Sequence, residues 1–252
     1  MLQFTLNFTK GSIQLNTGKL ENFEHRHLQA LLRQEPPDMT LLSEVLLEPV
    51  ESYVRQVDTE RRSLLSQQEL LSPDDFLHMQ GFGDLLPQFS TPEKAKEYIL
   101  KLFQANETKY QEHTDFILQN PYLLWQIPET TYALSTWHQI RNGKLNDRMV
   151  AIFKHLQLRL NAIPEDEWSS KTLQNSINDV ISNSTLRGEG DSDIRHVVYG
   201  TLRFALTGDH ERHSKPAKTV LALLGKEQSL VRLAVSRRVL ESVAPGDWIA
   251  RV

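Results

Sequence analysis

The sequence contains no cysteine among its 252 residues. This absence excludes disulfide bonds, thiolate zinc sites and cysteine nucleophiles together. No run of about 18 consecutive apolar residues is present, so nothing in the sequence predicts a membrane-spanning helix. The first ten residues carry one charge and no Arg-rich amphipathic pattern. We therefore expect no signal or transit segment there.

The chain also lacks an excess of positive charge. Its 28 Lys and Arg are outnumbered by 32 Asp and Glu, which gives a formal net charge of −4. This balance argues against a protein that coats nucleic acid indiscriminately. Residues 186–252 nevertheless hold 11 Lys or Arg against 8 Asp or Glu. A weakly basic C-terminal part on an acidic body favours a selective partner.

Apolar residues recur at three- and four-residue spacings through most of the chain, which predicts an all-α fold. Thr91-Pro92-Glu93 is typical of a helix start, and Asn120-Pro121 of its end. Further helices are predicted over these stretches: 149–160, 169–181 with a serine cap, 215–224 up to Gly225, and 226 to about 243. Residues 182–192 are polar and predict a loop. One stretch differs, because the alternation of apolar and polar residues over 2–15 predicts a hairpin.

Two blocks near the C-terminus carry a family resemblance. Residues 201–208 read Thr-Leu-Arg-Phe-Ala-Leu-Thr-Gly, and residues 221–227 read Leu-Ala-Leu-Leu-Gly-Lys-Glu. In this order, with a Pro-containing loop between them, they resemble the C-terminal end of bacterial-type and mitochondrial glutamyl-tRNA synthetases. The start of the chain (Phe4-Thr5-Leu6, Lys19-Leu20 and His27-Leu28) resembles the passage out of that family's stem-contact domain. The middle matches by helix order, by Tyr98 and by residues 122–125.

The resemblance implies a helical bundle followed by an α-helical anticodon-binding domain, with a short stem-contact remnant at the N-terminus. The corresponding ranges are 1–35 for the remnant, 36–125 for the bundle, 126–245 for the anticodon-binding domain and 246–252 for a loose tail. Over 2–8 the family is partly helical, and we follow it there rather than the hairpin. The implied partner is tRNA(Glu), together with a separate catalytic half, no membrane and a monomeric state. The implied location is the mitochondrial matrix in a eukaryote and the cytoplasm otherwise.

The resemblance also assigns candidate contacts to the tRNA. The residues that match the family's anticodon contacts are Arg203, Thr207, Gly208, Ser214, Lys215, Ala217 and, from the preceding bundle, Lys109. Arg212 and Lys218 are candidates for phosphate contacts, with His210 and His213 beside them. An Arg fork can bind two acceptors on one unpaired base edge. Lys109 stands where the family often has Arg, and a lysine lacks that fork.

Catalytic signatures are absent from the sequence. Neither a HIGH nor a KMSKS motif is present, and no Gly-rich phosphate loop follows a strand. The stretch 213–217, His-Ser-Lys-Pro-Ala, lies inside the anticodon-loop match, so we reject it as a KMSKS loop. We expect no catalytic residue and no cofactor in this chain, because ATP and glutamate would bind the missing catalytic domain. Whether the chain belongs to an active enzyme stays open.

The same residues also allow an interpretation without RNA binding. In that interpretation, Arg203 is a surface residue of an otherwise buried helix, and 210–218 is a solvated loop. The whole chain is then a helical interaction module that no longer binds RNA.

We expect no metal site at His25 and His27, because they face different sides of a helix. The acidic pair at 74–75 and the acidic triplet at 165–167 are typical of helix starts. Trp125, Trp137 and Trp168 are predicted core residues.

Overall fold

The computed structural model describes residues 26–67, 82–105, 113–141, 148–183, 186, 194–208 and 215–242. Helices make up 82% of these residues, and none of them forms a strand or a sheet. An isolated antiparallel bridge joins Leu85 to Trp125. The predicted all-α fold is confirmed. The hairpin or helix at the N-terminus, the C-terminal tail and most of the loop at 182–192 lie outside the described residues.

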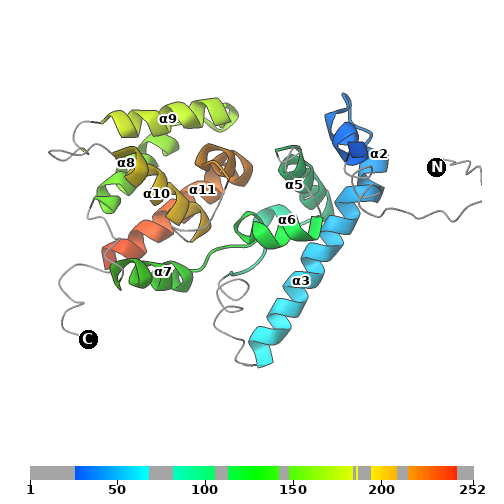
Figure 1. Ribbon diagram of the computed structural model, residues 1–252, viewed down its shortest axis with the longest axis horizontal. Helices are drawn as coiled ribbons and strands as arrows, with labels where there is room; N and C mark the ends of the chain where they lie inside the picture. The colour runs from blue at the N-terminus through cyan, green and yellow to red at the C-terminus, as the bar shows by residue number, and fades with distance from the viewer. Residues whose placement is uncertain are drawn as a thin grey trace, which may run out of the picture.

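The described helices form two groups, which are seen side by side in Figure 1. We call residues 26–125 the N-terminal lobe and residues 126–242 the C-terminal lobe. After a helical stretch over 26–33, the N-terminal lobe contains α2 (Met39–Leu42), the π-helical turn η1 (Ser43–Leu47), α3 (Glu48–Gln67), the 3-10 turn η3 (Pro87–Phe89), α5 (Pro92–Gln104), α6 (His113–Gln119) and the 3-10 turn η4 (Pro121–Leu123). The predicted domain boundaries stay a prediction.

Helix α5 begins where the sequence predicts. The hydroxyl of Thr91 accepts the N–H of Lys94 at 3.3 Å, and Pro92 occupies the first turn, which suits a residue with no N–H to donate. The prediction of one helix up to Asn120 is wrong, because α5 ends at Gln104 and α6 is a separate helix. The rings of Phe103 and Phe116 pack with their centroids 5.0 Å apart. Thirteen residues of continuous helix would separate them by about 20 Å.

The C-terminal lobe contains α7 (Glu129–Arg141), α8 (Met149–Asn161), the 3-10 turn η5 (Glu165–Glu167), α9 (Ser170–Ser182), α10 (Ile194–Thr207) and α11 (Ala217–Ser242). Ser169 caps α9 as predicted, since its hydroxyl accepts the N–H of Thr172. Gly225 interrupts α11 with φ 78° and ψ 170°. The two predicted helices that meet at this glycine are therefore confirmed, joined by a kink.

The tryptophans divide between core and surface. Trp125 is 2% exposed, and the half-buried Trp168 donates its indole N–H to the carbonyl of Leu221. Trp137 is 39% exposed, so its prediction as a core residue is wrong. It lies on α7 three residues after Leu134, which is 50% exposed. Both belong to the same outward face, because positions three apart are neighbours on a helix.

Candidate functional site

The C-terminal end of α10 carries the first predicted contact residues. Helix α10 buries Val198, Leu202 and Leu206, at four-residue spacing, while Arg203 lies exposed. The hydroxyl of Thr207 donates to the carbonyl of Arg203 at 2.9 Å. Such a bond gives a donor to a carbonyl near the end of a helix, where the last carbonyls have no intrahelical partner. The apolar stripe therefore fixes the helix on the core and turns Arg203 outward.

The next carbonyls of α10 also have donors. The N–H of Gly208 donates to Phe204 O at 2.9 Å, and the hydroxyl of Tyr132 to Ala205 O at 2.6 Å. Arg232 donates to Leu206 O, also at 2.6 Å. Buried carbonyls without partners are costly, so α7 and α11 together stabilise this helix end.

Gly208 ends α10 in a conformation that favours glycine. Its φ is +76°, and a Cβ there would lie 3.1 Å from Cγ2 of Ile127 and 3.3 Å from Cγ2 of Thr131. A side chain at this position would meet both the left-handed strain and the close approach of Ile127 and Thr131. The glycine predicted from the family resemblance thus has a structural role in closing the helix.

A hollow of about 480 Å³ opens beside this helix end. This volume falls within the roughly 300–1,000 Å³ of small-molecule sites. The hollow lies between α9, α10 and the start of α11, and its lining residues are Gln174, Tyr199, Arg203, Leu206, Thr207, Lys215, Pro216, Ala217, Lys218 and Val220.

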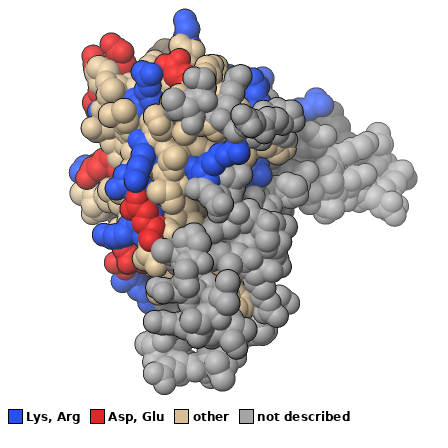
Figure 2. All heavy atoms as spheres, turned by 90° about the vertical axis from the view of Figure 1, so that its left-hand side faces the viewer, with Lys and Arg blue, Asp and Glu red and all other residues tan. Residues whose placement is uncertain are grey.

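The charge around the hollow is positive. Arg203, Lys215 and Lys218 line it, and no acidic residue is among the described lining residues. On the outer face of the C-terminal lobe, the left-hand side of Figure 1, basic and acidic side chains are interspersed (Figure 2). A local basic site on a mixed surface attracts an anion at one place rather than along a whole face.

The first turn of α11 adds to this charge. Pro216 precedes Ala217, and its carbonyl accepts the N–H groups of Thr219 and Val220 at 2.8 and 3.2 Å. The proline has the backbone angle of a helix start. The positive end of the helix dipole and the side chain of Lys218 thus lie at the same border of the hollow. Anionic groups such as phosphate bind well at such a place.

An aromatic ring and an amide complete the other border. Gln174 on α9 donates from Nε2 to the hydroxyl of Tyr199 on α10 at 2.9 Å. Tyr199 is half-buried and lies one turn before Arg203. Rings and guanidinium planes both stack on unpaired bases. Sequence reasoning missed Gln174 and Tyr199, although the four-residue spacing of Tyr199 and Arg203 on a helix was a usable signal.

A buried polar cluster around Arg232 adjoins the hollow through Leu206, whose carbonyl accepts a hydrogen bond from Arg232. Burial lowers the pKa of Arg232, and the nearby Tyr132, Tyr98 and Tyr122 oppose that effect. Burial raises the pKa of Tyr98 and Tyr132, which Arg232 partly offsets. The tyrosine hydroxyls stay protonated and serve as hydrogen-bond donors, for example from Tyr98 to Leu123 O at 2.8 Å.

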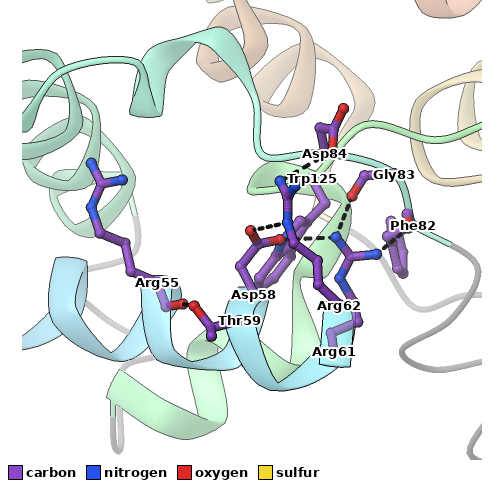
Figure 3. Close-up of polar contacts among 9 residues, drawn as sticks. All are labelled: Arg55, Asp58, Thr59, Arg61, Arg62, Phe82, Gly83, Asp84 and Trp125. Carbon is purple, nitrogen blue, oxygen red and sulfur yellow. Dashed lines mark hydrogen bonds and ion pairs between the residues drawn. The ribbon is translucent and has the colours of Figure 1, made fainter. Parts of the chain in front are cut away.

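A second network, drawn in Figure 3, holds the C-terminal half of α3 to the connection between the lobes. Asp58 accepts hydrogen bonds from Arg61 at 2.8 Å, from Arg62 at 2.8 Å and from the indole of Trp125 at 2.9 Å. Burial disfavours the Asp58 carboxylate, but these bonds outweigh it and hold the pKa of Asp58 below its usual value. Arg61 also donates to the carbonyl of Phe82 at 2.6 Å.

The predicted contact residues are thus partly assembled. Arg203, Thr207, Lys215, Ala217 and Lys218 line one hollow. Gly208 closes the helix beside it. Lys109, Arg212 and Ser214 lie outside the described residues, as do His210 and His213.

Lys215 has a further contact across the lobes. Its Nζ lies 5.4 Å from the centroid of the Phe116 ring on α6, a cation–π distance. Its backbone N–H approaches the hydroxyl of Tyr122 at 3.5 Å. The residue that enters α11 is therefore anchored to the N-terminal lobe.

The described residues offer neither a metal site nor a membrane-spanning helix. Among them, no group of three or more His, Cys, Asp or Glu could hold a metal ion, and no helix has both the length and the apolar character needed to cross a membrane. The acidic triplet predicted as helix-start chemistry forms the exposed turn η5 just before α9. His25 and the acidic pair at 74–75 lie outside the described ranges.

No family model, no curated protein and no solved structure matches this chain. The class defined by the structure is that of an all-α chain with a basic hollow at the end of one helix and the start of the next.

Proposed function

We propose that this chain binds tRNA(Glu) through its C-terminal lobe, as the anticodon-binding portion of a glutamate–tRNA ligase of the bacterial or mitochondrial type. The observation that carries the proposal is the shared position of Arg203, Thr207, Lys215, Ala217 and Lys218 around one hollow. The sequence predicts each of these residues as a contact to the tRNA, four from the family resemblance and Lys218 for its charge. Their convergence is what a common binding site requires.

The chemistry of the hollow suits an unpaired nucleotide. Arg203 offers a planar fork for the edge of a base, and Tyr199 offers a ring for stacking. Lys218 and the start of α11 suit a phosphate, which positions the RNA without reading its sequence. The net charge of −4 agrees with recognition at one site rather than general affinity for polyanions.

In this proposal the chain takes part in translation, and glutamylation itself occurs elsewhere. The parent reaction uses ATP to activate glutamate and transfers it to tRNA. The HIGH and KMSKS motifs that such a reaction needs are absent from the sequence. We expect no ATP–pyrophosphate exchange from this chain alone, and a separate catalytic half as its partner. The expected compartment is the mitochondrial matrix in a eukaryote and the cytoplasm otherwise.

Filter binding of the whole chain to tRNA(Glu), with a different tRNA as control, tests the proposal. We expect tighter binding of tRNA(Glu), with an affinity that falls as salt rises, because phosphate contacts release counterions. Equal binding of both tRNAs, or none, at about 100 mM salt would contradict specific recognition.

A second candidate function is a helical protein-interaction module that does not bind RNA. The observation that favours it is the exposed pair Leu134 and Trp137 on one face of α7, since exposed aromatic residues are common in protein interfaces. Purification from the natural source distinguishes the two functions. Protein partners with no RNA would support the module, and loss of those partners in Trp137→Ser would assign them to α7.

A further inference from the structure

One guanidinium joins the two lobes. Arg232 on α11 is 3% exposed. Its Nη1 donates to Leu206 O at 2.6 Å, and its Nη2 donates to Trp125 O at 3.0 Å. Leu206 belongs to α10 in the C-terminal lobe, whereas Trp125 is the last residue of the N-terminal lobe. The two arms of one planar group therefore bind backbone from both lobes.

The N-terminal side of this junction is held independently. The indole of Trp125 donates to Asp58 on α3 at 2.9 Å, within the network of Figure 3. A backbone bond from Leu86 N to Leu124 O holds the same connection at 2.9 Å. Gln126, the first residue of the C-terminal lobe, also donates its N–H to Asp84 O at 2.8 Å. The carbonyl that Arg232 binds thus has a fixed position relative to α3.

The acceptor in the C-terminal lobe borders the hollow. Leu206 lines the hollow, and so does the next residue, Thr207. A displacement of the Arg232 guanidinium would release Leu206 O and with it the wall of the hollow. Hydrogen bonds therefore connect Asp58 to the hollow. The indole of Trp125 donates to Asp58, and Arg232 donates both to the carbonyl of Trp125 and to that of Leu206.

Other contacts also join the lobes. Gln88 donates to Leu224 O at 3.2 Å, Lys215 lies over the ring of Phe116, and the N–H of Lys215 approaches the hydroxyl of Tyr122 at 3.5 Å. Each of these contacts relies on a single donor. The guanidinium differs because its two donors are fixed in one plane, so that binding both carbonyls defines an orientation as well as a distance.

We propose that Arg232 is a positioning residue that sets the orientation of the C-terminal lobe on the N-terminal lobe. By holding Leu206, it also sets the wall of the RNA-binding hollow. Only this last consequence rests on the proposed function. The orientation of the lobes is a property of the free protein.

The absence of cysteine allows a direct test in the whole chain. Ser52→Cys on α3 and Asp179→Cys on α9 introduce two exposed label sites, one in each lobe. Pulsed electron paramagnetic resonance of the spin-labelled protein then gives the distribution of distances between the lobes. We expect Arg232→Lys, which keeps the cation but removes the fork, to shift the mean distance and broaden the distribution. Arg232→Met should shift it further.

The proposal is overturned if Arg232→Lys leaves the distribution unchanged. A merely stabilising role would lower the denaturation midpoint and leave the native distances alone. If Arg232→Met does not fold, the distance distribution of Arg232→Lys still tests the proposal. Arg237→Met is the matched control, since Arg237 on the same helix donates to Gln157 within the C-terminal lobe at 2.6 Å. We expect that variant to keep the wild-type distribution.

Measuring tRNA binding by the same variants separates the two proposals. If the wild-type chain binds no tRNA, the proposed function fails, and the distances between the lobes still test Arg232. If it binds tRNA(Glu), we expect Arg232→Lys to weaken that binding severalfold and Arg237→Met to leave it unchanged. Wild-type binding in an Arg232→Lys protein with shifted lobes would contradict the link to the hollow.

Discussion

The hydroxyl of Tyr132 on α7 donates to the carbonyl of Ala205 on α10 at 2.6 Å, inside the core of the C-terminal lobe. The same ring packs edge-on against Phe204, with centroids 5.5 Å apart. One side chain therefore supplies both apolar contact and the hydrogen bond that the helix end needs. Removing the hydroxyl alone separates these two contributions.

We predict that Tyr132→Phe lowers the free energy of unfolding by about 1–3 kcal/mol, because Ala205 O is left buried without its donor. Urea denaturation followed by circular dichroism measures the change. The matched control is Tyr53→Phe. Tyr53 is half-buried, and its hydroxyl has no hydrogen-bond partner within the described ranges, so its loss should change stability by less than about 0.5 kcal/mol. Equal effects of the two substitutions would show that the Ala205 bond contributes nothing.

Acid should weaken the junction at Asp58. A carboxyl whose pKa is lower in the folded protein stabilises it above the unfolded pKa, which is about 3.9 for Asp. That contribution is lost as the pH falls through the folded value. At neutral pH, Asp58→Asn should cost about 1.5–3 kcal/mol, the range for hydrogen bonds to charged groups. Below about pH 4 the difference between wild type and variant should shrink.

Urea unfolding of both proteins across this pH range measures the difference. Other carboxyl groups titrate in both proteins, so their contributions cancel in the stability difference. A stability difference that stays constant on acidification would show that Asp58 does not have the lowered pKa that its three donors impose.

Replacing two glycines by alanine should change the stability of the protein in opposite directions. Gly225 has φ 78° and ψ 170°, a region that is nearly exclusive to glycine, so Gly225→Ala should destabilise the protein by about 1–3 kcal/mol. Gly200 lies inside α10, and a Cβ there meets nothing within 4 Å. Gly200→Ala should stabilise by about 0.5–1 kcal/mol. Thermal and urea denaturation give both values, and destabilisation at both positions would contradict this account of the kink.

The basic residues of the hollow should affect RNA binding in different ways. We predict that Arg203→Ala weakens binding of tRNA(Glu) by about 1–3 kcal/mol and reduces discrimination against other tRNAs. Lys218→Ala should weaken all tRNAs alike and reduce the salt slope by about 1. Titrations at several salt concentrations measure both quantities. Unchanged affinity and selectivity in Arg203→Ala would remove that residue from the site.

Local signals in the sequence predicted the helices well. The cap at Thr91, the cap at Ser169 and the break at Gly225 all act within a few residues, where side-chain chemistry decides the outcome. The separation of α5 from α6 was missed because it depends on a tertiary contact, the packing of Phe103 on Phe116. Periodicity alone cannot distinguish one long helix from two that fold onto each other.

The site was predicted by resemblance more than by physics. The resemblance selected residues such as Arg203 and Lys215, which the structure brings to one hollow, but it gave no indication of Gln174 across the hollow on α9. The two internal polar networks were also missed. Arg232 stands in an apolar stretch with Ser229 and Ser236 on the same face of the helix, a pattern typical of a buried polar seam. Its two acceptors are backbone carbonyls, and no side-chain pattern predicts those.

Recognition of the anticodon by the C-terminal lobe can be measured directly. The measurement compares the affinity of the whole chain for tRNA(Glu) with that for the same tRNA carrying another tRNA's anticodon loop. We predict weaker binding of the exchanged tRNA by about 1–3 kcal/mol for each base that no longer matches its side chain, and no such difference in Arg203→Ala. Equal affinity of the wild-type chain for the two tRNAs would contradict anticodon recognition.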